Sequence, residues 1–215
     1  MLLSFFKGSF ILPVDYLLFL QIVFFLCITP GTPKIVIMTY AINYGLRRST
    51  ITAFGDISAN TIQMIFVAFG VGAIIIANPE ILNYAKWVGV IYLLYLAFDL
   101  KRSSTNFNFE ENLSSKSNFS LYRDGFMVAF FSPKAWVFFG AMFPQFLNLN
   151  GDFKIQLLIL ILSYMLIDFS TLILYGFVAK KIVTWLKANP KTINLISACA
   201  ILIIAIILAS SSFGL

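Results

Sequence analysis

Residues 16–42 read YLLFLQIVFFLCITPGTPKIVIMTYAI, and residues 125–147 read GFMVAFFSPKAWVFFGAMFPQFL. Both segments are long enough to cross a bilayer, and each contains the dipeptide Pro-Lys, at 33–34 in the first and at 133–134 in the second. Proline removes a backbone donor and lysine carries a charge, so a membrane accepts the two together only beside protein or a water-filled cavity. Such breaks at corresponding places in two halves of a chain indicate the binding site of a transporter.

The composition is that of an integral membrane protein. Of the 215 residues, 60% are hydrophobic and 11% are charged, whereas soluble domains have about 25% charged residues. The chain has no histidine, which excludes a histidine triad and most zinc or iron sites, so we expect neither a metal nor a cofactor. Its cysteines, Cys27 and Cys199, stand singly in apolar segments, as helix-packing residues do. The net charge of +6 does not indicate nucleic acid, because the basic residues lie in short loops beside membrane segments.

Six segments reach the length of a transmembrane helix, which is about 20 apolar residues. They are residues 16–42, 51–77, 81–100, 125–147, 153–179 and 193–213. The polar stretch 101–122 separates three spans from three, and we interpret it as a cytoplasmic linker. The prediction is one all-α transporter domain over residues 1–215, with halves at 1–100 and 123–215.

The positive charges predict the orientation of these spans. Ten of the 15 lysine and arginine residues follow the first, third and fifth spans, which places those loops in the cytoplasm. We therefore expect a multi-pass protein of the bacterial cytoplasmic (inner) membrane with both termini outside. Three spans per half make the second half enter from the opposite side, so two halves of the same fold form an inverted repeat with broken first and fourth helices.

The first break has two interpretations. The run Thr29, Pro30, Gly31, Thr32 and Pro33 can unwind the helix, so that the half-helix after it offers free N–H groups and a partial positive charge to a carboxylate. The two threonine hydroxyls would add donors. The alternative is a structural kink whose backbone is satisfied by neighbouring helices.

Two lysines and one carboxylate lie within the predicted spans. Lys134 is about ten residues from either end of its span, whereas Lys34 is nearer an end and can partly snorkel or form an ion pair. Asp168 is near the middle of the fifth span, where a carboxylate is either a proton carrier or a fixed counter-ion to one of the lysines. Lys134 and Asp168 both lie near the midplane of their spans, so a direct pair between them is one hypothesis, and the sequence leaves open which lysine is the partner.

The second predicted span carries two further polar residues. Asp56 is only five residues into this span, which favours a solvated interfacial position over a central one, with proton coupling as its functional interpretation. Asn60, one turn deeper on the same face, can bind substrate or bridge helices. Gly55 and Ala59 form a small-xxx-small pair that permits close helix approach, either within one chain or in a homo-oligomer.

Several motifs resemble those of the lysine exporter / homoserine resistance (LysE/RhtB) family of bacterial amino-acid exporters. Thr-Pro-Gly at 29–31 is similar to the start of its T-P-G-P-N signature, and Gly-Leu-Arg-Arg at 45–48 to the basic turn that follows. Residues 87–96 resemble the third span. Ser-Pro-Lys-Ala at 132–135 resembles its N-P-K-A motif, and Phe-Pro-Gln-Phe at 143–146 matches the end of the same span.

The chain departs from the family pattern at both breaks. Thr32 and Pro33 stand where the family has a proline and an asparagine, Ser132 replaces an asparagine, and Asn60 stands where an aspartate is common. These differences bear on the substrate more than on family membership. We assign the second break, Ser132 with the adjoining Pro-Lys pair at 133–134, to substrate binding together with the first.

The resemblance implies a six-span secondary transporter that exports small amino acids and is driven by the proton gradient. Two lysines inside the membrane would repel a basic substrate unless they are paired, which favours a neutral amino acid such as homoserine or threonine. A membrane enzyme would have to use isolated Asp, Lys and Ser side chains. An inorganic cation exporter or channel is compatible with the two aspartates but gives the lysines no task.

Overall fold

The structure is a computed structural model that describes residues 13–77, 115–147 and 151–179, with single residues and short runs between 84 and 98 and between 181 and 210. Every regular element in the three continuous ranges is a helix. The elements are α2 (Tyr16–Ile28), α3 (Thr32–Tyr44), α4 (Leu46–Ala77), α6 (Asn118–Phe130), α7 (Pro133–Met142), the 3-10 helix η2 (Phe143–Phe146) and α8 (Phe153–Phe177). Below, α2–α4 are the first half and α6–α8 the second half.

Two helices are straight candidate spans, and two pairs are bent. Leu46–Gly70 of α4 and all of α8 are each 25 residues long and apolar enough to cross a membrane. The pair α2 and α3 bends by 52° at its break, and the pair α6 and Lys134–Phe146 bends by 56°. The described residues thus contain two candidate spans, or four if each bent pair crosses as one. Within the predicted spans 81–100 and 193–213 the structure describes single residues and short runs, all of them helical.

Two helices begin earlier than their hydropathy predicts. The helix α4 starts at Leu46, five residues before the predicted span, and α6 starts at Asn118, inside the predicted linker 101–122. Gly45 ends α3 with φ 83°, a conformation that favours glycine, and Ser117 caps α6 by accepting a hydrogen bond from the backbone N–H of Ser120. A hydropathy window detects only the apolar part of a helix, so it misses polar first turns.

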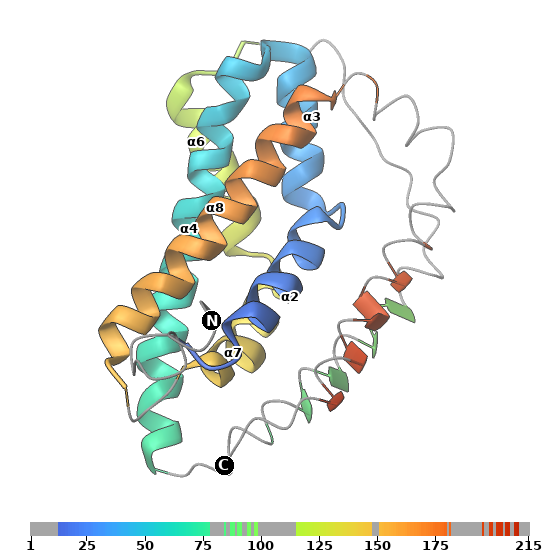
Figure 1. Ribbon diagram of the computed structural model, residues 1–215. Helices are drawn as coiled ribbons and strands as arrows, with labels where there is room; N and C mark the ends of the chain where they lie inside the picture. Colours follow the sequence, from blue (N-terminus) through green and yellow to red (C-terminus); the bar gives the residue numbers. More distant parts are fainter. Residues whose placement is uncertain are drawn as a thin grey trace, which may run out of the picture.

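The helices α4 and α6 run side by side, while α8 crosses α4 at an angle (Figure 1). A Cβ atom added at Gly55 would lie 2.1 Å from the carbonyl oxygen of Tyr122, and one added at Gly125 would lie 2.1 Å from that of Thr52. No side chain fits at this distance, so the two glycines set the helix separation. Gly55, predicted to permit close helix packing, does so between α4 and α6 of the same chain.

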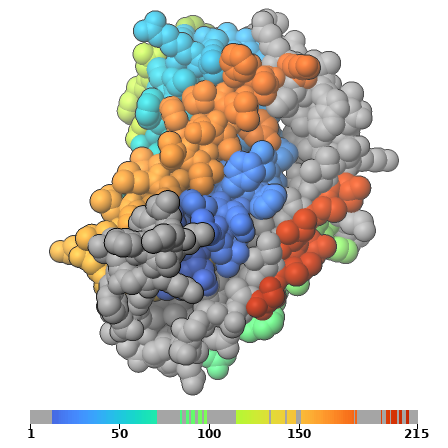
Figure 2. Space-filling view, viewed as in Figure 1, coloured from blue at the N-terminus to red at the C-terminus, as the bar shows by residue number. Residues whose placement is uncertain are grey.

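Aromatic side chains hold α2 against the second half. The Phe19 ring makes edge contacts with Phe143 and Phe146 at centroid distances of 6.3 and 5.2 Å, and all three are buried. The Tyr16 hydroxyl shares a 2.7 Å hydrogen bond with that of Ser163. Figure 2 shows α2 in blue and α8 in orange next to each other on one face. The broken pair of the first half is thereby packed against the long helix of the second.

Candidate functional site

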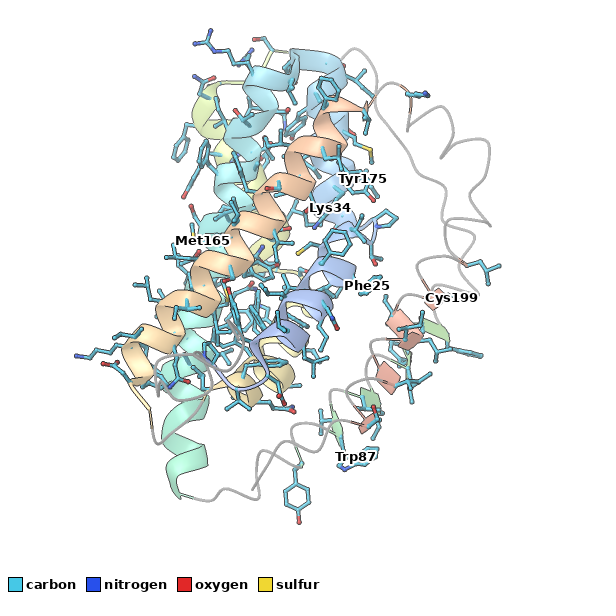
Figure 3. The ribbon with its side chains drawn as sticks, viewed as in Figure 1. Phe25, Lys34, Trp87, Met165, Tyr175 and Cys199 are labelled. Atoms are coloured by element: carbon cyan, nitrogen blue, oxygen red, sulfur yellow. The ribbon has the colours of Figure 1, made fainter. Side chains whose placement is uncertain are left out.

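A buried polar cluster joins α3, α4 and α8. Lys34 Nζ donates to Asp168 Oδ1 at 3.0 Å, and Asn60 Nδ2 donates to Asp168 Oδ2 at 3.1 Å and to Asp56 Oδ2 at 2.9 Å. Each of these four residues is at most 8% exposed. Figure 3 labels Lys34 where α3 lies beside α8. The four side chains form one continuous hydrogen-bonded network across both halves.

The helix break explains how a lysine reaches this depth. Lys34 is the third residue of α3, directly after the interruption between Ile28 and Thr32, and Asp168 is the sixteenth of the 25 residues of α8. A buried lysine in a membrane protein requires a partner, and the carboxylate supplies one. The sequence leaves the partner of Asp168 open between the two lysines, and the structure pairs it with Lys34.

Lys134 is near the cluster but outside its hydrogen bonds. It is partly exposed and lies close enough to Lys34, Cys27 and Asp168 for charge interactions. None of the salt bridges within 4.0 Å among the described residues includes it. The Cys27 thiol lies against Asp168, although from the sequence we expected only a packing role for it. Lys134 therefore lies beside the cluster without a salt bridge to its described residues.

Polar side chains satisfy the backbone at the first break. Thr29 Oγ1 donates to the carbonyl oxygen of Phe25 at 2.7 Å, and Tyr175 Oη donates to that of Ile28 at 2.7 Å. The N-cap of α3 is Gly31, and no side chain caps this helix end. The Thr29 hydroxyl, assigned to substrate binding from the sequence, is thus engaged with the backbone, and Thr32 is exposed.

Side chains also satisfy the backbone at the second break. Gln63 Nε2 donates to the carbonyl oxygens of Phe130 at 3.0 Å and Ala129 at 3.4 Å, and Trp136 Nε1 donates to Phe130 at 2.6 Å. Ser132 Oγ caps α7 by accepting from the backbone N–H of Ala135 at 3.4 Å. Each break thus accepts a hydrogen bond from the opposite half, from Tyr175 at the first and from Gln63 at the second.

Sequence reasoning missed Gln63 and misplaced Asp56. Asp56, Asn60 and Gln63 follow the spacing i, i+4, i+7 and so lie on one face of α4, a polar stripe in an apolar helix that could have identified Gln63. The solvated interfacial position predicted for Asp56 is wrong, because its side chain is 1% exposed. The helix begins at Leu46, and the additional turn and a half carries Asp56 into the protein.

Two oxygen atoms of this stripe are buried without a donor. Within the described residues, Asp56 Oδ1 and Gln63 Oε1 have no hydrogen-bond partner. Buried acceptors of this kind are suited to a group that donates several hydrogen bonds, such as an ammonium. Among the described residues, no group of three or more His, Cys, Asp or Glu side chains is arranged to hold a metal ion.

Comparison with known proteins places this architecture in a family. Residues 24–212 match the family described as LysE type translocator. The homoserine/homoserine lactone efflux protein of Salmonella typhi is 26% identical over 188 residues, covering 86% of this chain and 91% of that protein. The leucine efflux protein of Klebsiella pneumoniae is 25% identical over 168 residues, covering 76% and 79%. No solved structure matches the chain. The family match spans most of the sequence and includes both breaks, and the chain therefore belongs to the LysE type translocators.

Proposed function

We propose that this protein exports small neutral amino acids, of the homoserine or threonine kind, from the cytoplasm in exchange for protons. The observation that carries the proposal is the buried network of Lys34, Asn60, Asp56 and Asp168 between two broken helices. Membrane proteins place charges at this depth for substrate or ion pathways. The relatives named for homoserine and leucine efflux support the substrate class.

The cluster is complementary to a zwitterion. Asp56 Oδ1, which is buried without a donor, offers an acceptor to an α-ammonium group, and Lys134 offers a positive charge to the carboxylate. The N-terminus of α3, which no side chain caps, adds the positive end of a helix dipole near the first break. We assign the ammonium to α4 and the carboxylate to the two half-helix starts.

Asp56 is the better proton carrier of the two aspartates. Asp168 is fixed by Lys34 and by Asn60, whereas one oxygen of Asp56 has no partner among the described side chains. A proton and the substrate ammonium would compete for that oxygen. Mutually exclusive binding is what an antiporter requires, since a carrier that bound both would move them in the same direction.

The proposed architecture has six spans in two inverted halves, in the cytoplasmic membrane with both termini outside. Two observations support it: each half contains one bent helix pair, with a lysine directly after the break, and the basic residues gather on one side. The helices α3 and α6 then lie in the cytoplasmic half of the membrane, and α2 and α7 in the outer half.

Proteoliposomes containing the purified protein test the function. We expect counterflow of labelled homoserine or threonine, and net export that follows an imposed proton gradient. Asp56→Asn should abolish gradient-driven export while some counterflow persists with a raised KM, because the carboxamide still accepts a hydrogen bond but takes up no proton. Gradient-driven export by this variant would contradict the assignment, and conductance of an inorganic cation without amino-acid counterflow would favour a channel.

A further inference from the structure

A second polar cluster lies on the same helices, nearer the end that carries the basic residues. Tyr40 Oη donates to Asp124 Oδ2 at 2.7 Å, and Lys116 Nζ lies 2.7 Å from that hydroxyl and 2.6 Å from the same carboxylate oxygen. Lys116 Nζ is also 5.0 Å from the centre of the Tyr40 ring. The hydrogen bond and ion pair with Asp124, together with the Tyr40 hydroxyl, raise the pKa of Lys116, so it is charged at neutral pH.

Arginines support this cluster at its edge. Arg48, at the start of α4, donates to the backbone carbonyl oxygen of Lys116 and stacks over the ring of Tyr44 at 5.4 Å. Arg123 Nη2 is 3.7 Å from Asp124 Oδ1. Lys116, two residues before α6, is thereby tied to α3 and α4.

The cluster connects the two halves at one level of the membrane. Tyr40 belongs to α3 of the first half and Asp124 to α6 of the second. Tyr40 is six residues beyond Lys34 on one helix, which is about 9 Å along the axis. Tyr40 is 7% exposed, whereas the side chain of Lys116 is 31% exposed. The cluster therefore lies between the buried site and the basic end of the molecule, with its outer side in contact with solvent.

We propose that Tyr40, Lys116 and Asp124 form the gate that closes the buried site on the cytoplasmic side. The proposal rests on the proposed export function, in which the substrate reaches Asp56 from the cytoplasm, and the hydrogen bond from Tyr40 to Asp124 joins α3 to α6 on that side. The contacts that hold the gate are two hydrogen bonds and one partly exposed ion pair, with no apolar plug among them. Such contacts are weak enough to open reversibly.

Cys27 is a native reporter of opening. Its thiol is buried against Asp168, and Cys199 is exposed, so Cys199→Ser leaves one concealed cysteine. The experiment measures the rate at which a membrane-impermeant methanethiosulfonate modifies Cys27, in inside-out vesicles and in intact cells. Tyr40→Phe removes one hydroxyl and keeps the ring, and Asp124→Asn removes the charge.

In inside-out vesicles both variants should be modified about tenfold faster than the parent, the shift expected when a charge-assisted hydrogen bond is lost from a two-state opening. In intact cells the rate should not change. Tyr16→Phe is the matched control, since it removes a hydroxyl at the start of α2, on the other side of the first break, that bonds Ser163, and its rate in inside-out vesicles should equal that of the parent.

Unchanged modification in both variants, with thermal unfolding retained, would overturn the gate. Equal acceleration from both sides would also overturn it, because it would indicate loosening of the whole bundle. Acceleration in intact cells alone would place the cluster on the outer side, against the proposal. The readout requires no substrate, so it remains informative even if amino-acid counterflow is absent.

Discussion

The ion pair between Lys34 and Asp168 allows a quantitative test of the site. Its Nζ–Oδ1 distance is 3.0 Å, and the two side chains are 10% and 1% exposed. Removing one partner of such a pair leaves the other charge buried, at a cost of about 3–5 kcal/mol. In a chain of this size each kcal/mol corresponds to about 2–4 °C. Asp168→Asn and Lys34→Met should therefore each lower the Tm in detergent by roughly 6–20 °C, as followed by tryptophan fluorescence.

The double variant separates the charge from the rest of the site. Lys34→Met with Asp168→Asn removes both charges, and the new carboxamide still accepts the hydrogen bond from Asn60. The double variant should recover most of the lost stability, with a coupling energy of at least about 2 kcal/mol, because an uncharged pair of similar volume is often tolerated in place of a buried ion pair.

Lys134→Met is the matched control for this double-mutant cycle of Lys34 and Asp168. Lys134 has no salt bridge within 4.0 Å among the described residues, so its loss should change the Tm by only about 2 °C or less, a surface-like effect. The reasoning is refuted if Asp168→Asn leaves the Tm within this range, or if the double variant is as unstable as the sum of the two single variants. A large effect of Lys134→Met with none of Lys34→Met would identify Lys134 as the partner of Asp168.

Two further substitutions test how the helices are held. Gly125→Ala would place a Cβ atom 2.1 Å from a backbone carbonyl oxygen of α4 and should lower the stability by at least about 1–3 kcal/mol, whereas Gly70→Ala on α4 meets no atom within 4 Å and should be neutral or slightly stabilising. A neutral Gly125→Ala would contradict the tight crossing. Gln63→Leu leaves the carbonyl oxygen of Phe130 with one donor fewer and should cost about 1–3 kcal/mol, measured by thermal unfolding. An unchanged Tm would show that Trp136 alone satisfies the second break.

The sequence predicted the position of both breaks but not how they are satisfied. The proline-lysine pairs mark the breaks because proline cannot donate in a helix interior, which is a local property of the chain. The donors that satisfy the breaks come from residues distant in the sequence, Tyr175 for Ile28 and Gln63 for Phe130. Their identity depends on how helices pack and rotate against one another, and hydropathy contains no such information.

Because hydropathy contains no packing information, the sequence also does not show which lysine pairs with Asp168. Lys34 and Lys134 both follow a proline in the first turn of a half-helix, so local reasoning treats them alike. Depth along the span favoured Lys134, but depth says nothing about direction around the helix axis. The polar stripe of α4, in contrast, can be predicted from the sequence. Residues spaced i, i+4 and i+7 lie on one face of a helix, whatever its neighbours are.

The two halves are coupled because each helix break accepts a hydrogen bond from a side chain of the opposite half. The hydroxyl of Tyr175 in the second half bonds the first break, and the amide of Gln63 in the first half bonds the second. A rocking motion of one half against the other would separate both donors from their carbonyls together. An unsatisfied carbonyl inside a membrane costs several kcal/mol, so the motion requires water or a substrate to replace the lost donors. In the proposed function, a substrate bound between the halves would bring such donors. We infer that the empty site resists the motion and the loaded site permits it, which is the order of events that export requires.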